Sequence, residues 1–309
     1  MNGRLNGRPV IDFHARLIPR PTAVDRLLAT MDDCGIDRAV VSAGGVIDLD
    51  LLSKQVTEGG HVETDADNDA VLRGCERSDG RLVPFYFANP HADPDDYRRR
   101  AGEFRGVELA PAVHGVALND ERTAALVDVA GEFGHPVYLL CMIKPGFNVR
   151  DLVELARRFT GVTFVLGHCG FTNLDLYAIN AIAPESNIVT DTSGGYTIVV
   201  GAALERLGAD RVLFGTEYPL QHPSVELAKL RALDVPPETW RKVAWSNAHR
   251  LLGEEPPPNG DGARPAEHEE ANGDGIRAAR PGPGPGSGSR PGSGSGSGPG
   301  PGSHPPGMG

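Results

Sequence analysis

The chain has 309 residues, with 30 basic and 41 acidic side chains, a formal charge of −11, and many glycines (40) and prolines (26). An acidic chain without a basic stripe argues against nucleic acid as the main partner, and no apolar run approaches the ~18 residues that a membrane span needs. The first residues lack the apolar stretch of a secretory signal, and the four cysteines show no C-x-x-C spacing, so we expect a cytoplasmic protein with reduced thiols.

Eight short β-branched or apolar runs predict strands that are buried on both faces, as in a parallel sheet. In chain order they are PVIDF near Ile11, RAVVS near Val40, LVPFYFA near Val83, GVEL near Val107, PVYLLC near Tyr138, VTFVL near Phe164, NIVTD near Val189 and RVLFG near Leu213. Their centres lie 24 to 31 residues apart, except for one longer gap that holds a polar insert over 48–67. This spacing is typical of repeated strand–helix units.

Amphipathic stretches with start and stop signals lie between these strands. Four of them are AVDRLLATMDDC, DPDDYRRRAGEF, NDERTAALVDVAGEF and NVRDLVELARRFT, and two more, PSVELAKLRAL and PPETWRKVAWSNAHRLLG, follow the last strand. Side chains suited to begin a helix and glycines suited to end one flank the first four. These capping positions are, in chain order, Gly35, Asp93, Asn119 and Asp120, Gly134, Asn148 and Gly161.

The end of the chain has a different composition from the rest. Glycine (16) and proline (12) make up 28 of the 56 residues from Glu254 to Gly309, and such a segment cannot bury enough apolar surface to offset its ordering entropy. The remaining 253 residues fit one (β/α)₈ barrel. A doubly wound sheet would carry a glycine-rich turn after its first strand, where this chain has only His14-Ala-Arg16. We therefore predict an α/β fold with a (β/α)₈ barrel over 1–253 and a disordered tail over 254–309.

Polar side chains gather at the predicted strand ends, where barrels of this kind place their active sites. Histidines and carboxylates at several strand mouths are typical of a metal or acid–base site. We take Glu217 and His168 as candidate catalytic residues. The candidate substrate-binding residues are Arg16, Glu108, Asn89 and His91, and the candidate metal ligands are His14, His168 and Glu217.

Five motifs in the expected order resemble the amidohydrolase-related family of the amidohydrolase superfamily, which includes aminocarboxymuconate-semialdehyde decarboxylase and related hydrolases. The resemblance runs from about Val10 to Gly253. The motifs are IDFHAR (family pattern D-x-H-x-H), GVELAP (G-x-K-L-H-P), FVLGHCG (F-x-x-x-H-x-G), VLFGTEYPL (L-F-G-[ST]-D-Y-P) and SNAHRLLG (N-A-x-x-L-x-G). The resemblance implies a (β/α)₈ barrel that acts on a small molecule.

The resemblance also implies a ligand set that this chain keeps only in part. Members of this type hold one divalent metal through two histidines of strand 1, a histidine ending strand 5 and an aspartate of strand 8, and a histidine on strand 6 assists catalysis. Here His14 and His168 match the first strand-1 histidine and the strand-6 histidine. The other three positions are Arg16, Leu140 and Glu217.

Three interpretations of this altered set stay open. In the first, His14, His168 and Glu217 hold a divalent metal such as zinc, which needs only three protein ligands, with Glu108 as a further candidate; Arg16 opposes this electrostatically. In the second, the site works without metal. Arg16 then grips a carboxylate or oxyanion, Glu217 acts as base, and His168 polarises or protonates the substrate. In the third, the pocket only binds, and Arg16 pairs with Glu217.

The predicted function is hydrolysis of a C–N or C–O bond of a small, carboxylated molecule, with water activated at the barrel mouth. A decarboxylase or hydratase on the same scaffold is the alternative, because a cation such as Arg16 suits a carboxylated substrate. A non-catalytic binding protein is the third hypothesis. The expected partner is a small-molecule substrate, with neither nucleic acid nor membrane, and a homo-oligomer is compatible with the sequence.

Overall fold

Short parallel strands form the centre of the computed structural model, which describes residues 8–255. They form two sheets, with the orders β1-β2-β3 and β4-β5-β6-β7-β8-β9. The strands are β1 (Ile11–Leu17), β2 (Arg38–Ala43), β3 (Leu82–Pro84), β4 (Tyr86–Phe87), β5 (Val107–Leu109), β6 (Val137–Leu139), β7 (Phe164–Leu166), β8 (Ile188–Asp191) and β9 (Val212–Leu213). These nine strands correspond to the eight predicted runs, because the single run LVPFYFA contains both β3 and β4, which are separated at Phe85.

Backbone hydrogen bonds close the two sheets into one barrel. At the first junction, the Phe85 N–H donates to the Val41 carbonyl at 2.9 Å. At the second, the Arg16 N–H donates to the Tyr218 carbonyl at 2.7 Å, and Ala15 pairs with Tyr218 in parallel. The strand that opens the chain therefore lies beside the segment that follows the last strand, as the predicted (β/α)₈ barrel requires.

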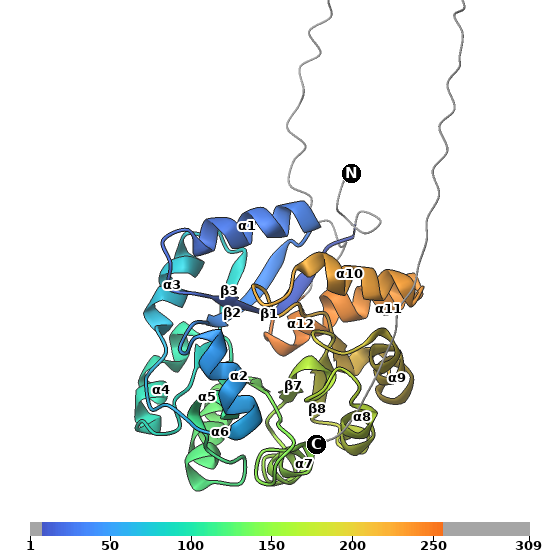
Figure 1. Ribbon diagram of the computed structural model, residues 1–309. Helices are drawn as coiled ribbons and strands as arrows, with labels where there is room; N and C mark the ends of the chain where they lie inside the picture. Colours follow the sequence, from blue (N-terminus) through green and yellow to red (C-terminus); the bar gives the residue numbers. More distant parts are fainter. Residues whose placement is uncertain (1–7, 256–309) are drawn as a thin grey trace, which may run out of the picture. The chain divides into compact units, whose positions relative to one another are not determined.

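Helices surround the strands (Figure 1). They are α1 (Ala23–Cys34), α2 (Leu49–Glu58), α3 (Asn68–Glu76), α4 (Pro94–Arg100), α5 (Pro111–His114), α6 (Glu121–Phe133), α7 (Val149–Arg158), α8 (Leu176–Ile182), α9 (Thr197–Leu207), α10 (Pro223–Ala232), α11 (Pro237–Arg241) and α12 (Asn247–Leu251). A π-helical turn, Lys242–Ser246, joins α11 to α12, and short 3₁₀ turns cover Ala101–Glu103, Gly167–Cys169 and Ala209–Arg211.

The predicted caps begin and end several of these helices. Asn148 forms a capping box at the start of α7, and Gly35 and Gly134 end α1 and α6 with left-handed φ angles of 70° and 67°. Helix α7 ends at Arg158 rather than at the predicted Gly161. The capping residues therefore predicted the first residue of α7 more accurately than its last residue.

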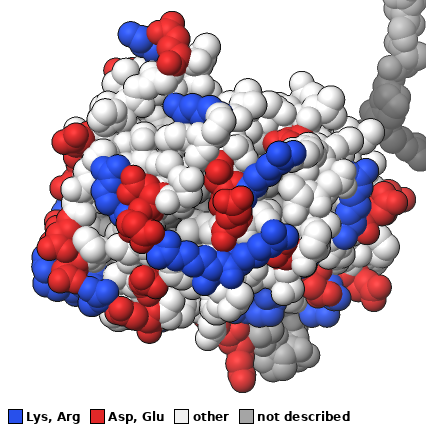
Figure 2. Space-filling model, turned by 90° about the horizontal axis from the view of Figure 1, so that it is seen from below, with Lys and Arg blue, Asp and Glu red and all other residues white. Residues whose placement is uncertain are grey.

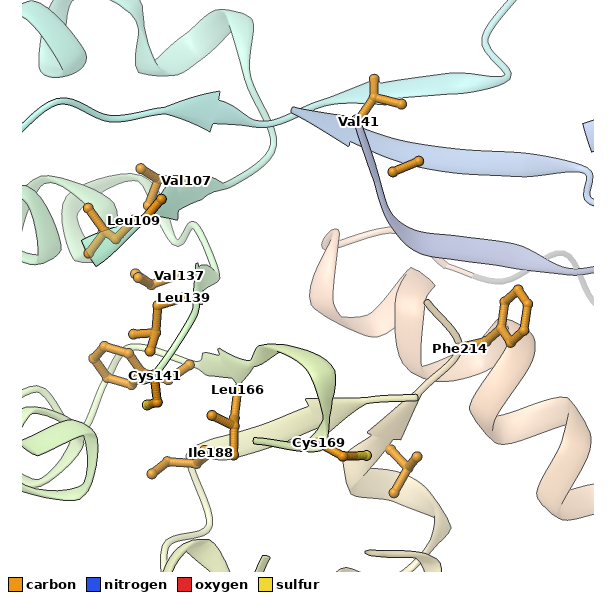
Figure 3. Close-up of a cluster of buried hydrophobic side chains, with 14 of the residues drawn as sticks. Val41, Val107, Leu109, Val137, Leu139, Cys141, Leu166, Cys169, Ile188 and Phe214 are labelled. Atoms are coloured by element: carbon orange, nitrogen blue, oxygen red, sulfur yellow. The ribbon is translucent and has the colours of Figure 1, made fainter. Parts of the chain in front are cut away.

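Alternate residues of each strand enter two different apolar layers. On β6, Val137 and Leu139 join the layer between strands and helices that Figure 3 shows, whereas Tyr138 joins the cluster inside the barrel. Phe13 and Phe85 belong to the same interior cluster and meet edge to face, with ring centroids 5.7 Å apart. Strands covered on both faces need apolar residues at nearly every position, which explains the continuous runs in the sequence.

The predicted polar insert contains a helix that its composition did not predict. Helix α2 begins at the carboxylate of Asp48, which accepts a hydrogen bond from the Leu51 N–H at 2.7 Å. The chain returns beside α5, where the Val62 N–H donates to the Val113 carbonyl at 3.0 Å. Gln55 is the buried residue of α2. The insert therefore carries a helix of its own that packs lightly on the barrel.

The predicted disordered tail lies outside the described residues except for its first two positions. Of these, Glu254 pairs with Arg38 at 2.6 Å, so the ordered contacts of the barrel extend at least this far. On the surface in Figure 2, basic side chains lie beside acidic ones. Many of these opposite charges form ion pairs between adjacent helices, as Arg98 does with Glu132. No helix within 8–255 is long and apolar enough to cross a membrane.

Candidate active site

Five ionisable side chains meet at the carboxyl ends of the barrel strands. They come from β1 (His14 and Arg16), from β5 (Glu108) and from the turns after β7 and β9 (His168 and Glu217). Glu217 is central, since its Oε2 lies 2.5 Å from His14 Nδ1 and 2.8 Å from His168 Nε2. Its Oε1 accepts a hydrogen bond from Arg16 Nε at 3.0 Å, and Arg16 Nη2 lies 2.6 Å from Glu108 Oε1. The structure thus brings together five of the seven predicted site residues.

Two of these residues have backbone conformations that favour glycine. The φ angle is 64° at His168 and 59° at Glu217, which costs about 1–3 kcal/mol for each such residue. Hydrogen bonds hold both in place: the His168 N–H donates to Asp191 Oδ1 at 2.7 Å, and the Glu217 N–H donates to the His14 carbonyl at 2.8 Å. These turns aim both side chains at a common point, and strain of this kind often accompanies functional sites.

Asp12 fastens the first strand to the turn that carries Glu217. Its carboxylate accepts hydrogen bonds from the His14 N–H at 3.1 Å, the Thr216 N–H at 2.9 Å and the Thr216 hydroxyl at 2.5 Å. Burial raises the pKa of Asp12 to about 7, although these hydrogen bonds oppose the rise. The first aspartate of the IDFHAR motif therefore positions neighbouring groups and lies beneath the reacting end of the site.

Tyr138 and Asp191 support the cluster from below and had no predicted role. The Tyr138 hydroxyl donates to Asp191 Oδ2 at 2.9 Å and lies 2.9 Å from His14 Nδ1. The Tyr138 and His14 rings stack with centroids 3.9 Å apart. One signal could have suggested Tyr138, because it alternates with the outward-facing Val137 and Leu139 and must therefore point into the barrel.

The charges of the cluster balance one another. Burial lowers the pKa of His14, but the carboxylates of Glu217 and Glu108 outweigh burial and raise it to about 10. Burial raises the pKa of Glu217, but the positive charges of His14 and Arg16 hold it well below its usual value. The Arg16 guanidinium likewise keeps the pKa of Glu108 low in spite of burial. At neutral pH two carboxylates therefore face two cations.

The cluster lies at the floor of a cavity of about 850 Å³. Arg16, His168 and Glu217 line this cavity together with many apolar side chains, and we call it the mouth cavity. Leu140, at the position where the family carries a histidine, also lines it. A large apolar chamber with a few convergent polar groups is the usual form of a small-molecule site.

Asn89 and His91 lie apart from the cluster and do not line the mouth cavity. Asn89 Nδ2 donates to the Glu63 carbonyl at 2.9 Å and to Asp65 Oδ1 at 2.7 Å. His91 Nε2 lies 2.7 Å from the His114 carbonyl. Both side chains bind the segments that pass over the end of the third barrel strand, so their polar groups hold these segments in place.

Three side chains of the cluster offer donor atoms of the kind a metal ion needs. The donor atoms of His14, His168 and Glu217 lie within 4.8 Å of one another, and one buried polar atom of each lacks a hydrogen bond of regular geometry. A zinc ion can be held by three such ligands.

The charges of the same group do not fit a divalent cation. Glu217 already accepts a hydrogen bond from Arg16, so an ion bound to its carboxylate would lie next to a fixed guanidinium charge. His14 would also have to release the proton that Glu217 and Glu108 stabilise, because a metal ligand must be neutral imidazole. The charges of the cluster are therefore balanced without an ion, and of the site residues that the family resemblance implies only His14 and His168 are kept unchanged.

Comparison with known proteins places this site in a family context. The sequence profile of the family described as amidohydrolase matches residues 11–253, whereas no curated protein matches the chain. A solved 5-carboxyvanillate decarboxylase of Novosphingobium aromaticivorans, with manganese and 4-hydroxy-3-methoxy-5-nitrobenzoic acid, is similar at 17% identity and a TM-score of 0.60, covering 81% of this chain and 97% of its own.

Two further solved structures share the fold. A 2,6-dihydroxybenzoate decarboxylase from Rhizobium is 16% identical, with a TM-score of 0.59 and coverage of 80% of this chain and 98% of its own. A candidate 2-pyrone-4,6-dicarboxylic acid hydrolase from Pseudomonas putida is 17% identical, with a TM-score of 0.61 and coverage of 79% and 97%. At such identities the likeness establishes the barrel and leaves the reaction to be argued from the site.

Proposed function

The chain belongs to the amidohydrolase family, and we propose that it hydrolyses a C–N or C–O bond of a small carboxylated molecule without the help of a metal ion. One observation carries this proposal: Arg16, His168 and Glu217 meet at the floor of the mouth cavity, within hydrogen-bond distance of one another through the Glu217 carboxylate. Arg16 supplies a fixed positive charge, and the His168–Glu217 pair supplies proton transfer.

Arg16 retains hydrogen-bond donors for a ligand. A guanidinium has five N–H groups; Nε donates to Glu217, and Nη2 contacts Glu108. Nη1 has no hydrogen-bond partner among residues 8–255, and Arg16 lines the mouth cavity. The remaining N–H groups suit a substrate carboxylate or the oxyanion that forms when water attacks a carbonyl carbon.

His168 is better suited than Glu217 to accept a proton. Because the pKa of Glu217 is held well below its usual value, its carboxylate stays ionised and binds a proton weakly. The side chain of His168 is 25% exposed, and its Nε2 faces Glu217. Glu217 therefore orients the imidazole and stabilises its protonated form. This assignment differs from the second interpretation of the sequence, in which Glu217 acts as the base.

The reaction then has two proton transfers through one imidazole. His168 takes a proton from water while the water oxygen bonds to the substrate carbonyl carbon. It returns that proton to the departing nitrogen or oxygen when the C–N or C–O bond breaks. His14 stays protonated beneath Glu217 and keeps that carboxylate ionised throughout.

A decarboxylase is the second candidate. It is favoured by the apolar wall at Leu140 beside the cluster, since a carboxylate held against an apolar surface loses hydration that the less charged transition state does not need. Two of the similar solved structures are also named as decarboxylases. In this case the substrate would lose carbon dioxide, and His168 would protonate the resulting carbanion.

The experiment screens the full chain against carboxylated esters, lactones and amides, with aromatic carboxylic acids in parallel, by mass spectrometry and carbon dioxide release. On the best substrate, His168→Ala should lower kcat by a factor of about 10²–10⁴, whereas Asn89→Ala, outside the mouth cavity, serves as the control. Near wild-type rates for both His168→Ala and Glu217→Gln would refute the assignment. Activity lost on treatment with a chelator would refute the metal-free mechanism.

A further inference from the structure

The walls of the mouth cavity are apolar from floor to rim. Only five of its lining residues carry polar or charged side chains, namely Arg16, Arg20, Asp48, His168 and Glu217. The volume of about 850 Å³ lies near the upper end of the range of about 300–1,000 Å³ that small ligands occupy. A carboxylate with a single ring would therefore leave much of this apolar surface uncovered.

Helix α2 contributes an apolar face to one side of the cavity. Leu49, Leu52 and Val56 follow one another at helical spacing and all line the cavity. Leu49 is nevertheless 61% exposed and Val56 36% exposed. Large apolar side chains that face a cavity and remain open to water favour ligand binding, because the free energy falls when a ligand removes their surface from water.

Glycines flank both ends of α2. Gly44 and Gly45 precede the helix, and Gly59 and Gly60 follow it. Three of these four have φ angles between 73° and 124°, a region that other residues seldom adopt. Since Gln55 is the buried residue of the helix, little packing opposes its displacement, as is typical of segments that open locally.

The charged groups of the floor favour an anionic ligand. At the rim, Arg20 and Asp48 carry opposite charges, and the Asp48 carboxylate also caps α2. On the floor, the charges of Glu108 and Glu217 are already matched by His14 and Arg16, and Arg16 keeps N–H groups for a ligand. An anion can therefore bind these N–H groups, whereas an amine meets no carboxylate there that lacks a cationic partner.

We propose that the substrate is an amphipathic carboxylate whose apolar body is larger than a single ring, and that α2 closes over that body as a lid. The inference rests on the proposed function only for the place of the reaction, at the floor. Leu140 stands where the family resemblance implies a polar metal ligand. It extends the apolar surface of the cavity down to the reacting groups, so an apolar ligand body can approach them.

The first test is calorimetric titration of the full chain with butanoate, hexanoate, octanoate and decanoate. Affinity should rise about fourfold per added CH₂, as for apolar burial, and decylamine should bind at least tenfold more weakly than decanoate. Affinity that does not depend on chain length, or equal binding of decylamine, would overturn the substrate class.

The second test compares two neighbouring positions of the lid. Leu52→Asp places a charge on the face that lines the cavity and should weaken decanoate binding at least tenfold while changing butanoate binding less than twofold. Ser53→Asp places the same charge on the exposed face and should change neither. If the two variants behave alike, the lid is refuted. Leu52→Ala, a milder change, should lower decanoate affinity in part.

Hydrogen exchange tests closure of α2 in the unaltered chain, so the result does not depend on any substitution. Decanoate should slow amide exchange over 45–60 in the unaltered chain, whereas unchanged exchange there would refute closure. These measurements report binding and not turnover. A chain that binds decanoate as described but hydrolyses no ester, lactone or amide would refute the proposed function alone, and hydrolysis of short, polar substrates only would refute this inference alone.

Discussion

Removing the Arg16 guanidinium while keeping the size of the side chain, as in Arg16→Met, should strongly destabilise the barrel. The side chains of Glu108 and Glu217 are only 1% and 8% exposed, and Arg16 contacts both. Breaking a buried ion pair by removing one partner costs about 3–5 kcal/mol, and two carboxylates lose a partner here. For a domain of this size each kcal/mol lowers Tm by roughly 2–4 °C, so we expect a fall of about 6–20 °C.

Urea unfolding followed by circular dichroism measures this change, and a second variant isolates its cause. Adding Glu108→Gln to Arg16→Met removes one of the two stranded charges and should restore part of the lost stability, so the two changes should couple by about 0.5–3 kcal/mol. Arg98→Met, which breaks an exposed pair with Glu132, should leave the stability almost unchanged. Our account of the charge balance would fail if Arg16→Met were as mild as Arg98→Met, or if its effect simply added to that of Glu108→Gln.

Three further outcomes follow from the same cluster. The pKa of His14 is raised from 6.5 to about 10, so its contribution to stability is complete below pH 6.5 and is lost as the pH rises through about 10; Tm measured by calorimetry should fall over this window, and less so in His14→Gln. The double change Arg16→His/Leu140→His restores two family ligands and should bind about one equivalent of zinc by elemental analysis, where the unaltered chain binds none. In kinetics on the best substrate, Glu217→Gln should lower kcat, because a neutral amide no longer pairs with His168 or with the charge of Arg16.

The barrel could be predicted largely because its signals are local. An apolar run such as VTFVL and a cap such as Asn148 act within a few residues, and each appears in the structure as a strand or a helix start. The division of LVPFYFA at Phe85 and the helix in the insert were not foreseen. Leu49, Leu52 and Val56 have helical spacing, but the acidic and polar residues between them obscure this pattern. The apolar face of the helix borders a cavity and not another element, so the helix lacks the long apolar stripe of a packed helix.

The site was foreseen where a residue lies in or after the carboxyl end of a strand, and it was missed where a residue lies deeper in the barrel. His14 and Arg16 lie in the second half of β1 and Glu217 follows β9, so topology alone brings them together. The contact of Tyr138 with His14 joins residues 124 positions apart, and no local pattern specifies which side chains meet across the interior. Asn89 was expected at the cavity for its strand end, yet its amide binds a segment of the insert whose path the sequence pattern does not define.

The residues at the positions where the family resemblance implies metal ligands form a consistent set rather than a decayed site. A chance loss of ligands would leave buried carboxylates without partners, which folded proteins rarely tolerate. Here Arg16 and the protonated His14 together supply two positive charges, the same number as a divalent ion, and they face two carboxylates. His168 and Glu217 also adopt left-handed conformations, although a barrel that merely bound a ligand would have little reason to hold two such strained positions. The strained turns, the balanced charge and the access of His168 to the mouth cavity therefore favour an active enzyme over a non-catalytic binding protein.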